Sequence, residues 1–158
     1  MRPTNWDGNS AGTKPSLDRV IVLDTDHLTE LGYNTPPGRR LAEHIEKAAT
    51  GDAITIISVQ EQMKGLLARI AKARSVEDQE LAYAALGDRL NVLASFVHLP
   101  WDREAAALFS KLRQTGIRIG TMDLKIACIV MAHDAVLLTR NTVDFEKVPG
   151  LKFENWLA

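Results

Sequence analysis

Short apolar runs alternate with long helical segments along this chain, and this pattern limits its fold more than any other feature. The runs are four or five residues long, which is typical of buried strands. They comprise residues 20–23, 53–57 and 135–138. Helical periodicity covers residues 38–50, 58–74, 102–115 and 121–133. Because parallel strands need crossover helices, the sequence predicts an α/β fold with a mainly parallel central sheet.

The other segments add smaller elements. Residues 59–97 carry apolar side chains at helical spacing and predict a long helical hairpin. Shorter features are expected as a break at 36–38, a strand or link at 98–99, extended backbone at 117–119 and a last strand at 151–153. The polar residues 1–19 predict a flexible tail, which leaves residues 20–158 as one domain.

Composition narrows the class of protein. The net charge is −1, so binding of nucleic acid would depend on a local basic patch. The single cysteine, Cys128, excludes an internal disulfide and is compatible with a reducing compartment. No apolar run approaches the roughly 18 residues of a membrane span. We therefore expect a cytoplasmic protein that does not contact a membrane.

Four acids stand at similar places in the expected topology. Asp24 follows the first strand, Glu61 the second and Asp144 the third, and Asp123 lies two residues into the helix after residues 117–119. The carboxyl ends of parallel strands share one edge of a sheet, so these acids are expected to meet there. Close carboxylates repel each other, and a divalent cation such as Mg²⁺ removes that repulsion. Such an ion activates water and neutralises a phosphodiester.

Helix capping is the alternative explanation for several of these acids. Ser58 and Glu61 have the spacing of a capping box, and residues 141–144 fit one more loosely. Asp123 near the start of a helix is favoured by the helix dipole. Asp24 is harder to explain in this way, because it directly follows a buried strand. The two interpretations are compatible, since a carboxylate at a helix start can also face the edge of the sheet.

Four sequence blocks resemble the PIN-domain family, and in particular its VapC-type toxins. The blocks are residues 20–26 (VIVLDTD), 57–65 (ISVQEQMKG), 119–127 (IGTMDLKIA) and 138–145 (LTRNTVDF), the last followed by VPGL at 148–151 and by Trp156. They occur in the order and spacing of the family and span about residues 20–157. The third block is the most specific of them.

The resemblance implies a fold, an activity and partners. It implies a PIN-like α/β/α sandwich, a bound Mg²⁺ or Mn²⁺ ion, and hydrolysis of RNA by a ribonuclease. It also implies the toxin of a type II toxin–antitoxin pair, held by a cognate antitoxin and assembled as a homodimer. Which RNA is cut, and whether the chain is a toxin or a processing nuclease, is left open at this stage.

The resemblance also assigns roles to single residues. Asp24 and Asp123 become the metal ligands, and Glu61 and Asp144 complete the catalytic acids through water. The site is lined by Asp26, Thr139 and Asn141, with Lys64 and Arg140 placed to contact phosphate. Two features depart from the family pattern: Asp26 stands where Asn is more usual, and the segment 1–19 has no counterpart.

Two other functions remain open on the sequence alone. Residues 24–28 (DTDHL) resemble the motif of haloacid dehalogenase-type phosphatases, in which Asp24 would be the nucleophile, although Leu28 stands where Thr or Val is usual. A non-catalytic PIN module that binds RNA or a protein is the second alternative. His27 is close to the acids in sequence, but we expect it to face solvent on a helix.

Overall fold

The computed structural model describes residues 19–48 and 51–158, and a five-stranded sheet with parallel neighbours lies at its centre. The strands are β1 (Val20–Leu23), β2 (Gly51–Thr55), β3 (Val97–Leu99), β4 (Val136–Leu138) and β5 (Phe153–Glu154). Their order across the sheet is β3-β2-β1-β4-β5. The predicted parallel sheet is confirmed.

The middle position belongs to β1. Its Ile21 lies opposite Asp52 of β2 on one side and Val136 of β4 on the other. Ile21, Val22 and Leu23 are fully buried, because helices cover both faces of the sheet. A central parallel strand of this kind consists of consecutive apolar residues, as the sequence VIVL does. The residue that follows β1 therefore lies in the middle of the carboxyl edge.

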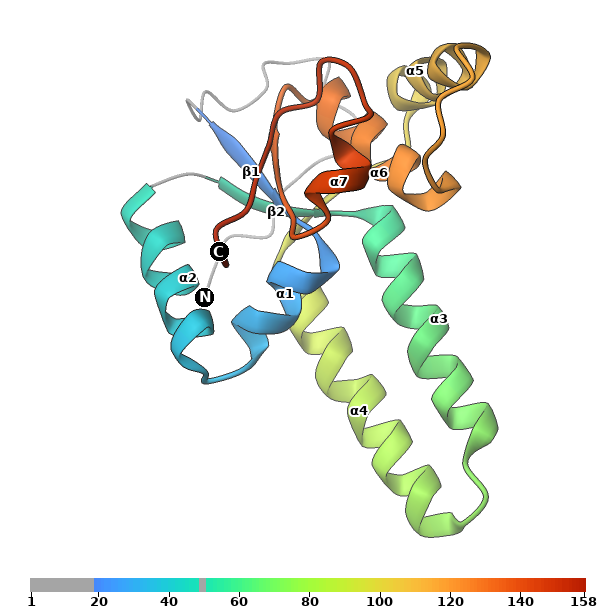
Figure 1. The fold of residues 1–158 in the computed structure, drawn as a ribbon. Coiled ribbons are helices and arrows are strands. Elements are labelled where there is room, and N and C mark those ends of the chain that lie inside the picture. Colours follow the sequence, from blue (N-terminus) through green and yellow to red (C-terminus); the bar gives the residue numbers. More distant parts are fainter. Residues whose placement is uncertain (1–18, 49–50) are drawn as a thin grey trace.

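Seven helices connect the strands in the described part of the chain. They are α1 (Thr25–Gly32), α2 (Pro36–Ala48), α3 (Ile56–Lys72), α4 (Val76–Ala94), α5 (Arg103–Gln114), α6 (Thr121–Ala132) and the short α7 (Thr142–Phe145). The pair α3 and α4 forms the expected long hairpin, which extends away from the sheet in Figure 1.

Alternate residues of β1 face two separate cores. Val22 packs in one core with Ile126 of α6, whereas Ile21 lies in a second core with Leu28 of α1 and Leu41 of α2. Helices thus cover both sides of the sheet (Figure 1). The predicted α/β/α sandwich is confirmed.

The boundary between β2 and α3 differs from the prediction. The strand ends at Thr55, two residues before the expected end, and α3 begins at Ile56. The Thr55 hydroxyl accepts the backbone N–H of Ser58 at 3.0 Å, which makes Thr55 the cap of the helix. Ser58 lies inside the first turn and is buried. The apolar run AITII therefore spans the end of a strand and the start of a helix.

Smaller differences occur elsewhere. Residues 117–119 form no strand in the described structure, and β5 lies at 153–154 where the sequence predicted 151–153. The expected break at residues 36–38 is the first turn of α2, which Pro36 opens. Proline suits the first helical position because its missing N–H has no partner there in any case.

Two predictions concern the ends and the membrane. The tail predicted at 1–19 lies outside the described residues except for Arg19, whose guanidinium pairs with Glu154. Among the helices of the described residues, none has the length and apolar character needed to cross a membrane.

Candidate active site

Asp24 lies at the carboxyl end of β1 and caps helix α1 at the same time. Its Oδ1 accepts the backbone N–H of Thr25 at 2.9 Å, and its Oδ2 accepts the hydroxyl of Thr139 at 2.8 Å. Only 9% of the residue is exposed. The cap and the edge position are therefore compatible, and the carboxylate is held in one orientation by two donors.

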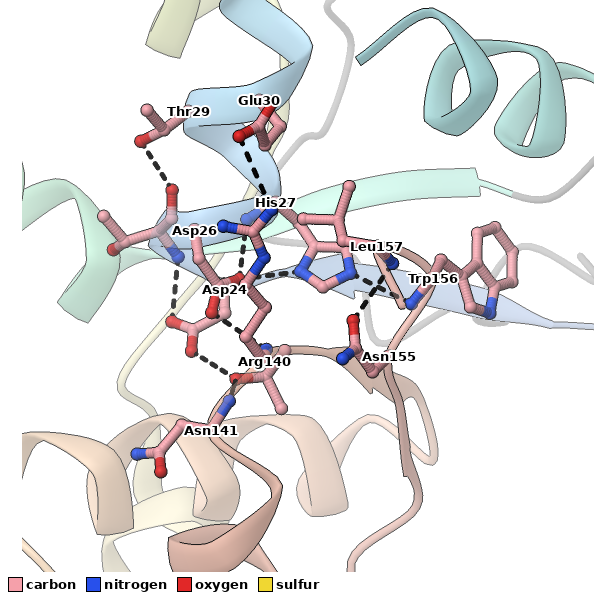
Figure 2. A network of polar contacts seen from close by, with 12 residues as sticks. Asp24, Asp26, His27, Thr29, Glu30, Arg140, Asn141, Asn155, Trp156 and Leu157 are labelled. Carbon is pink, nitrogen blue, oxygen red and sulfur yellow. Dashed lines mark hydrogen bonds and ion pairs between the residues drawn. The ribbon is translucent and has the colours of Figure 1, made fainter. Parts of the chain in front are cut away.

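Thr139, which donates to Asp24, lies in the loop after β4. The buried Thr139 hydroxyl accepts the backbone N–H of Asn141 at 3.1 Å while it donates to Asp24. The backbone N–H of Arg140 donates to Oδ2 of Asp26 at 2.8 Å, as Figure 2 shows. Residues 139–141 are thus tied to the end of β1 by both aspartates. This places the three predicted site-lining residues of the loop beside Asp24.

The acids of the edge repel one another. Burial raises the pKa of Asp24 above its ordinary range, and the charges of Asp26 and Asp123 raise it further, although the two donated hydrogen bonds act in the opposite direction. Burial also raises the pKa of Glu61, with Asp123 and Asp24 as further causes. The pKa of Asp123 is raised by burial and by Asp144. The four predicted acids therefore form one interacting set at this edge.

Glu61 does not serve as a helix cap. With the helix starting at Ile56 and Thr55 as its cap, Glu61 lies in the second turn of α3 rather than at the third helical position. The capping box that the spacing from Ser58 predicted is wrong. Glu61 is half-buried, and Lys64 one turn later is exposed and lowers its pKa slightly against the larger raising effects. Among the described residues, no backbone N–H group donates a hydrogen bond to the Glu61 carboxylate.

Asp123 lies in the first turn of α6, as the sequence predicted. Gly120 precedes the helix, and no side chain caps its first turn. The N–H groups of that turn favour a nearby negative charge. Asp123 is half-buried and faces Asp24 and Glu61 closely enough to raise the pKa of Glu61.

Asp144 is bound by a lysine and an amide side chain from its own segment. Lys147 donates to its Oδ1 at 2.6 Å, and the side-chain amide of Asn141 donates to its Oδ2 at 3.1 Å. These bonds lower the pKa of Asp144 below its usual value. Lys147, which is about half exposed, therefore forms an ion pair with the fourth acid.

His27 is the residue that the sequence interpretation missed. It was expected to face solvent, but none of its surface is exposed. Its Nδ1 lies 2.7 Å from Oδ1 of Asp26, and its Nε2 accepts the backbone N–H of Trp156 at 3.2 Å (Figure 2). The signal that could have been used is its place directly after Asp26 in the first turn of a helix that leaves the central strand.

Arg140 points its charged group toward α1. Its Nη2 lies 3.5 Å from Oε1 of Glu30, and 46% of the arginine side chain is exposed. At that distance and exposure the ion pair contributes little. Arg140 and Lys64 are both exposed and each lies near one of the acids, Arg140 beside Asp26 and Lys64 near Glu61, as a contact with phosphate requires.

The donor set suits a hard divalent cation. Within the described residues no group of three or more His, Cys, Asp or Glu side chains is arranged to hold a metal ion by itself. Mg²⁺ keeps several waters and needs only one or two direct carboxylates, which Asp24 and Asp123 offer. The set does not fit zinc, because Cys128 is buried in α6 and both ring nitrogens of His27 are already engaged. The residues present fit Mg²⁺ or Mn²⁺.

Comparison with known proteins gives named relatives. No family model matches the chain. Ribonuclease VapC2 of Rickettsia felis is 43% identical over 143 residues, which cover 87% of this chain and 98% of the relative. The VapC ribonuclease Y4jK of Sinorhizobium fredii is 33% identical over 133 residues, covering 80% and 91%. In the crystal structure of VapBC2 from Rickettsia felis bound to a promoter DNA fragment, a chain matches with a TM-score of 0.66 and 24% identity, over 87% of this chain and 98% of that one.

Proposed function

This chain belongs to the VapC family of ribonucleases, and we propose that it hydrolyses RNA with a Mg²⁺ or Mn²⁺ ion held at the carboxyl edge of its sheet. The observation that carries the metal proposal is that Asp24, Glu61 and Asp123 are buried or half-buried beside other acids, so that burial first, and then the charge of a neighbouring acid, raises the pKa of each carboxyl. A fold keeps such charges together at a cost, and a divalent cation offsets that cost.

The proposed roles follow from the contacts of each side chain. When bound, the cation supplies an activated water and neutralises charge on the phosphodiester. Asp24 and Asp123 hold it directly, and Glu61 and Asp144 hold water around it. Thr139 keeps Asp24 oriented through its 2.8 Å hydrogen bond. Lys64 and Arg140 bind phosphates of the RNA near the acids.

The proposal includes a partner and an assembly. The likeness to VapBC complexes supports an antitoxin as the binding partner, and so a toxin that acts on RNA in the cytoplasm. The hairpin of α3 and α4 offers a surface for contact with the antitoxin or with a second copy in a homodimer. Its large exposed apolar residues are Ile56, Leu67, Val76, Leu81, Tyr83, Leu90 and Val92. Apolar exposure of this kind on a soluble domain is typical of interfaces.

Substitution of the two ligands tests the nuclease proposal. Asp24→Asn and Asp123→Asn keep the size of the side chain and remove a negative charge. We expect cleavage of single-stranded RNA in Mn²⁺ to fall by more than about 100-fold, and calorimetric Mn²⁺ binding to weaken with it. Asp88→Asn, on the exposed surface of α4, is the matched control and should behave as the parent.

The melting temperature separates loss of function from loss of fold. Asp123→Asn relieves repulsion between acids and should not lower it. Asp24→Asn relieves the same repulsion but exchanges one accepting oxygen for a donating amide, so it should lower the melting temperature while the protein stays folded. If folded Asp24→Asn and Asp123→Asn proteins cleave RNA at the parental rate, the assigned ligands are wrong. Cleavage that continues undiminished in excess EDTA rules out the metal ion itself.

Two alternatives make different predictions in the same assays. A phosphatase that uses Asp24 as its nucleophile would release phosphate from a small phosphomonoester and form an aspartyl-phosphate. A non-catalytic module would bind RNA without cutting it and would show no Mn²⁺ binding. Family membership and the intact set of four acids favour the nuclease.

A further inference from the structure

We infer that His27 is a positioning residue of the nuclease site, because it fixes Asp26 and, through Asp26, the loop that carries Thr139 and Asn141. The inference rests on the proposed function for its effect on cleavage. Its structural part stands on the hydrogen bonds among His27, Asp26 and Arg140, which Figure 2 shows as one connected network.

The contacts of the imidazole assign its tautomer. The group facing Nε2 is the backbone N–H of Trp156, at 3.2 Å, and a backbone N–H only donates. Nε2 is therefore the acceptor and carries no hydrogen. The ring proton is on Nδ1, which donates to Oδ1 of Asp26 at 2.7 Å. Full burial leaves the ring no contact with solvent.

Asp26 uses both oxygens as acceptors. Oδ1 receives the Nδ1–H of His27 and also its backbone N–H, at 2.6 Å, and Oδ2 receives the backbone N–H of Arg140 at 2.8 Å. A carboxylate accepts at both oxygens, whereas an amide accepts at one and donates at the other. By binding Oδ1, His27 sets the plane of the Asp26 carboxylate and so the position at which Oδ2 accepts from the loop after β4.

The loop transmits this orientation to Asp24. Arg140 lies between Thr139, whose hydroxyl donates to Asp24, and Asn141, whose side chain donates to Asp144. A shift of the Arg140 backbone therefore moves the donors of two proposed catalytic acids together. In the described structure the His27 ring forms its hydrogen bonds with Asp26 and Trp156 and not with Asp24 or Asp144, and its full burial keeps it from contact with RNA.

The same ring also anchors the end of the chain. Trp156 follows β5, and its N–H bond to His27 joins this segment to α1. A buried histidine that served only to hold the C-terminal segment would need the Nε2 contact alone. The positioning role needs the Nδ1 contact, so substitutions that keep one or the other distinguish the two roles.

Substitution of His27 by Asn or by Gln separates the Nδ1 contact from the Nε2 contact. In His27→Asn the side-chain N–H₂ takes the place of Nδ1 and donates to Asp26, but no atom reaches Trp156. In His27→Gln the side-chain oxygen takes the place of Nε2 and accepts from Trp156, but the donor to Asp26 is lost. We expect His27→Gln to lose about 10–100-fold in kcat with KM unchanged, and His27→Asn to recover most of kcat. The control is His98→Gln on the exposed strand β3.

A readout without cleavage completes the test. Nitrogen NMR of the metal-free protein should show the Nδ1–H tautomer of His27, and the Arg140 amide signal should move in His27→Gln and much less in His27→Asn. Equal kcat values for the two variants, or a larger loss in His27→Asn, overturn the inference. If both variants unfold, two other measurements decide the inference. An Nε2–H tautomer of His27 in the parent protein, or an Arg140 amide signal that does not move in Asp26→Asn, overturns it. A parent protein that does not cleave RNA contradicts the proposed function, while the Arg140 signal still tests the positioning.

Discussion

Replacement of Thr139 by Val removes one hydroxyl at the centre of the site and leaves the shape of the side chain unchanged. The hydroxyl donates to Asp24 at 2.8 Å and accepts from the Asn141 backbone at 3.1 Å, and Thr139 is fully buried. A hydrogen bond to a charged group contributes about 1.5–3 kcal/mol, and an unmet buried N–H costs about 1–3 kcal/mol. Since Asn141 is only half-buried, we expect a total loss of about 2–4 kcal/mol in the free energy of unfolding.

Thr139→Ser is the matched control, because it keeps the hydroxyl and removes a methyl group. The lost methyl group costs about 1 kcal/mol. Urea unfolding in EDTA measures both variants against the parent without a contribution from bound metal. Because Val keeps the shape of Thr, the polar part of the loss is the difference between Thr139→Val and the parent, and Thr139→Ser measures the contribution of the methyl group alone.

Metal binding supplies a second measurement on the same pair. Asp24 in Thr139→Val keeps only the donor from Thr25, so its carboxylate is free to turn. Mn²⁺ affinity should fall in Thr139→Val and stay near the parental value in Thr139→Ser, by an amount typical of lost outer contacts, about 10–100-fold. A Thr139→Val protein as stable as Thr139→Ser, with parental affinity for Mn²⁺, would refute the idea that this hydroxyl orients Asp24.

Three further predictions concern the rest of the molecule. Gly38→Ala should lower the free energy of unfolding in urea by about 1–3 kcal/mol, because the added Cβ would meet the backbone oxygens of Glu30 and Tyr33. Gly87→Ala on the open surface of α4 should raise it by about 0.5–1 kcal/mol. Equal free energies for the two variants would contradict the close packing around Gly38. Burial raises the pKa of the Cys128 thiol to about 11, so its reaction with a disulfide reagent at pH 8 should be far slower in the folded than in the urea-unfolded protein. In EDTA the free energy of unfolding of Asp123→Asn should exceed that of the parent by more at pH 7 than near the ordinary range of carboxyl groups. A raised folded pKa contributes stability that is present at low pH and lost as the pH rises, and Asn removes that dependence. A difference that does not change with pH would contradict the raised pKa of Asp123.

The parts of the fold that the sequence predicted have a strong local signal. Three of the four residues of β1 are buried, so its apolar character is continuous and its bounds are clear. The strand β4 and the helix α6 are equally clear, because all three residues of β4 and seven of the twelve residues of α6 are buried. The location of the shared edge then follows from the parallel connections, whereas the order of the strands is visible only in the structure.

The boundary after β2 illustrates what a local pattern does not determine. Residues 53–57 are apolar or β-branched throughout, so hydropathy does not show where the strand becomes a helix. The decision depends on Thr55, whose hydroxyl reaches the N–H of Ser58. Because Ser58 is also a good cap residue, the sequence pattern favoured the wrong start. The error moved Glu61 from the first helical turn in prediction to the second in the structure.

The environment of His27 depends on a partner far along the chain. Its Nε2 contact is the backbone of Trp156, 129 residues away, and no spacing rule connects two such positions. The same holds for Thr139, whose role became visible only when β4 lay beside β1. The sequence could therefore predict which residue types meet at the edge, but not which of them hold each other in place.

The fold sorts five acids at this edge into two kinds, although their side chains are chemically almost the same. Asp26 accepts hydrogen bonds from three N–H groups, and Asp144 accepts them from the side chains of Lys147 and Asn141. The pKa of each of these carboxyls is lowered, although burial of Asp26 acts in the opposite direction. Asp24, Glu61 and Asp123 are left with too few donors to offset burial and repulsion. The first kind fixes the backbone around the site, which allows the second kind to stay close together. A cation at 100 times its dissociation constant would return about 2.7 kcal/mol of stability to the folded state. Under the proposed function, the repulsion among the three acids is the physical reason why this edge would bind a divalent ion and, through it, a phosphodiester substrate.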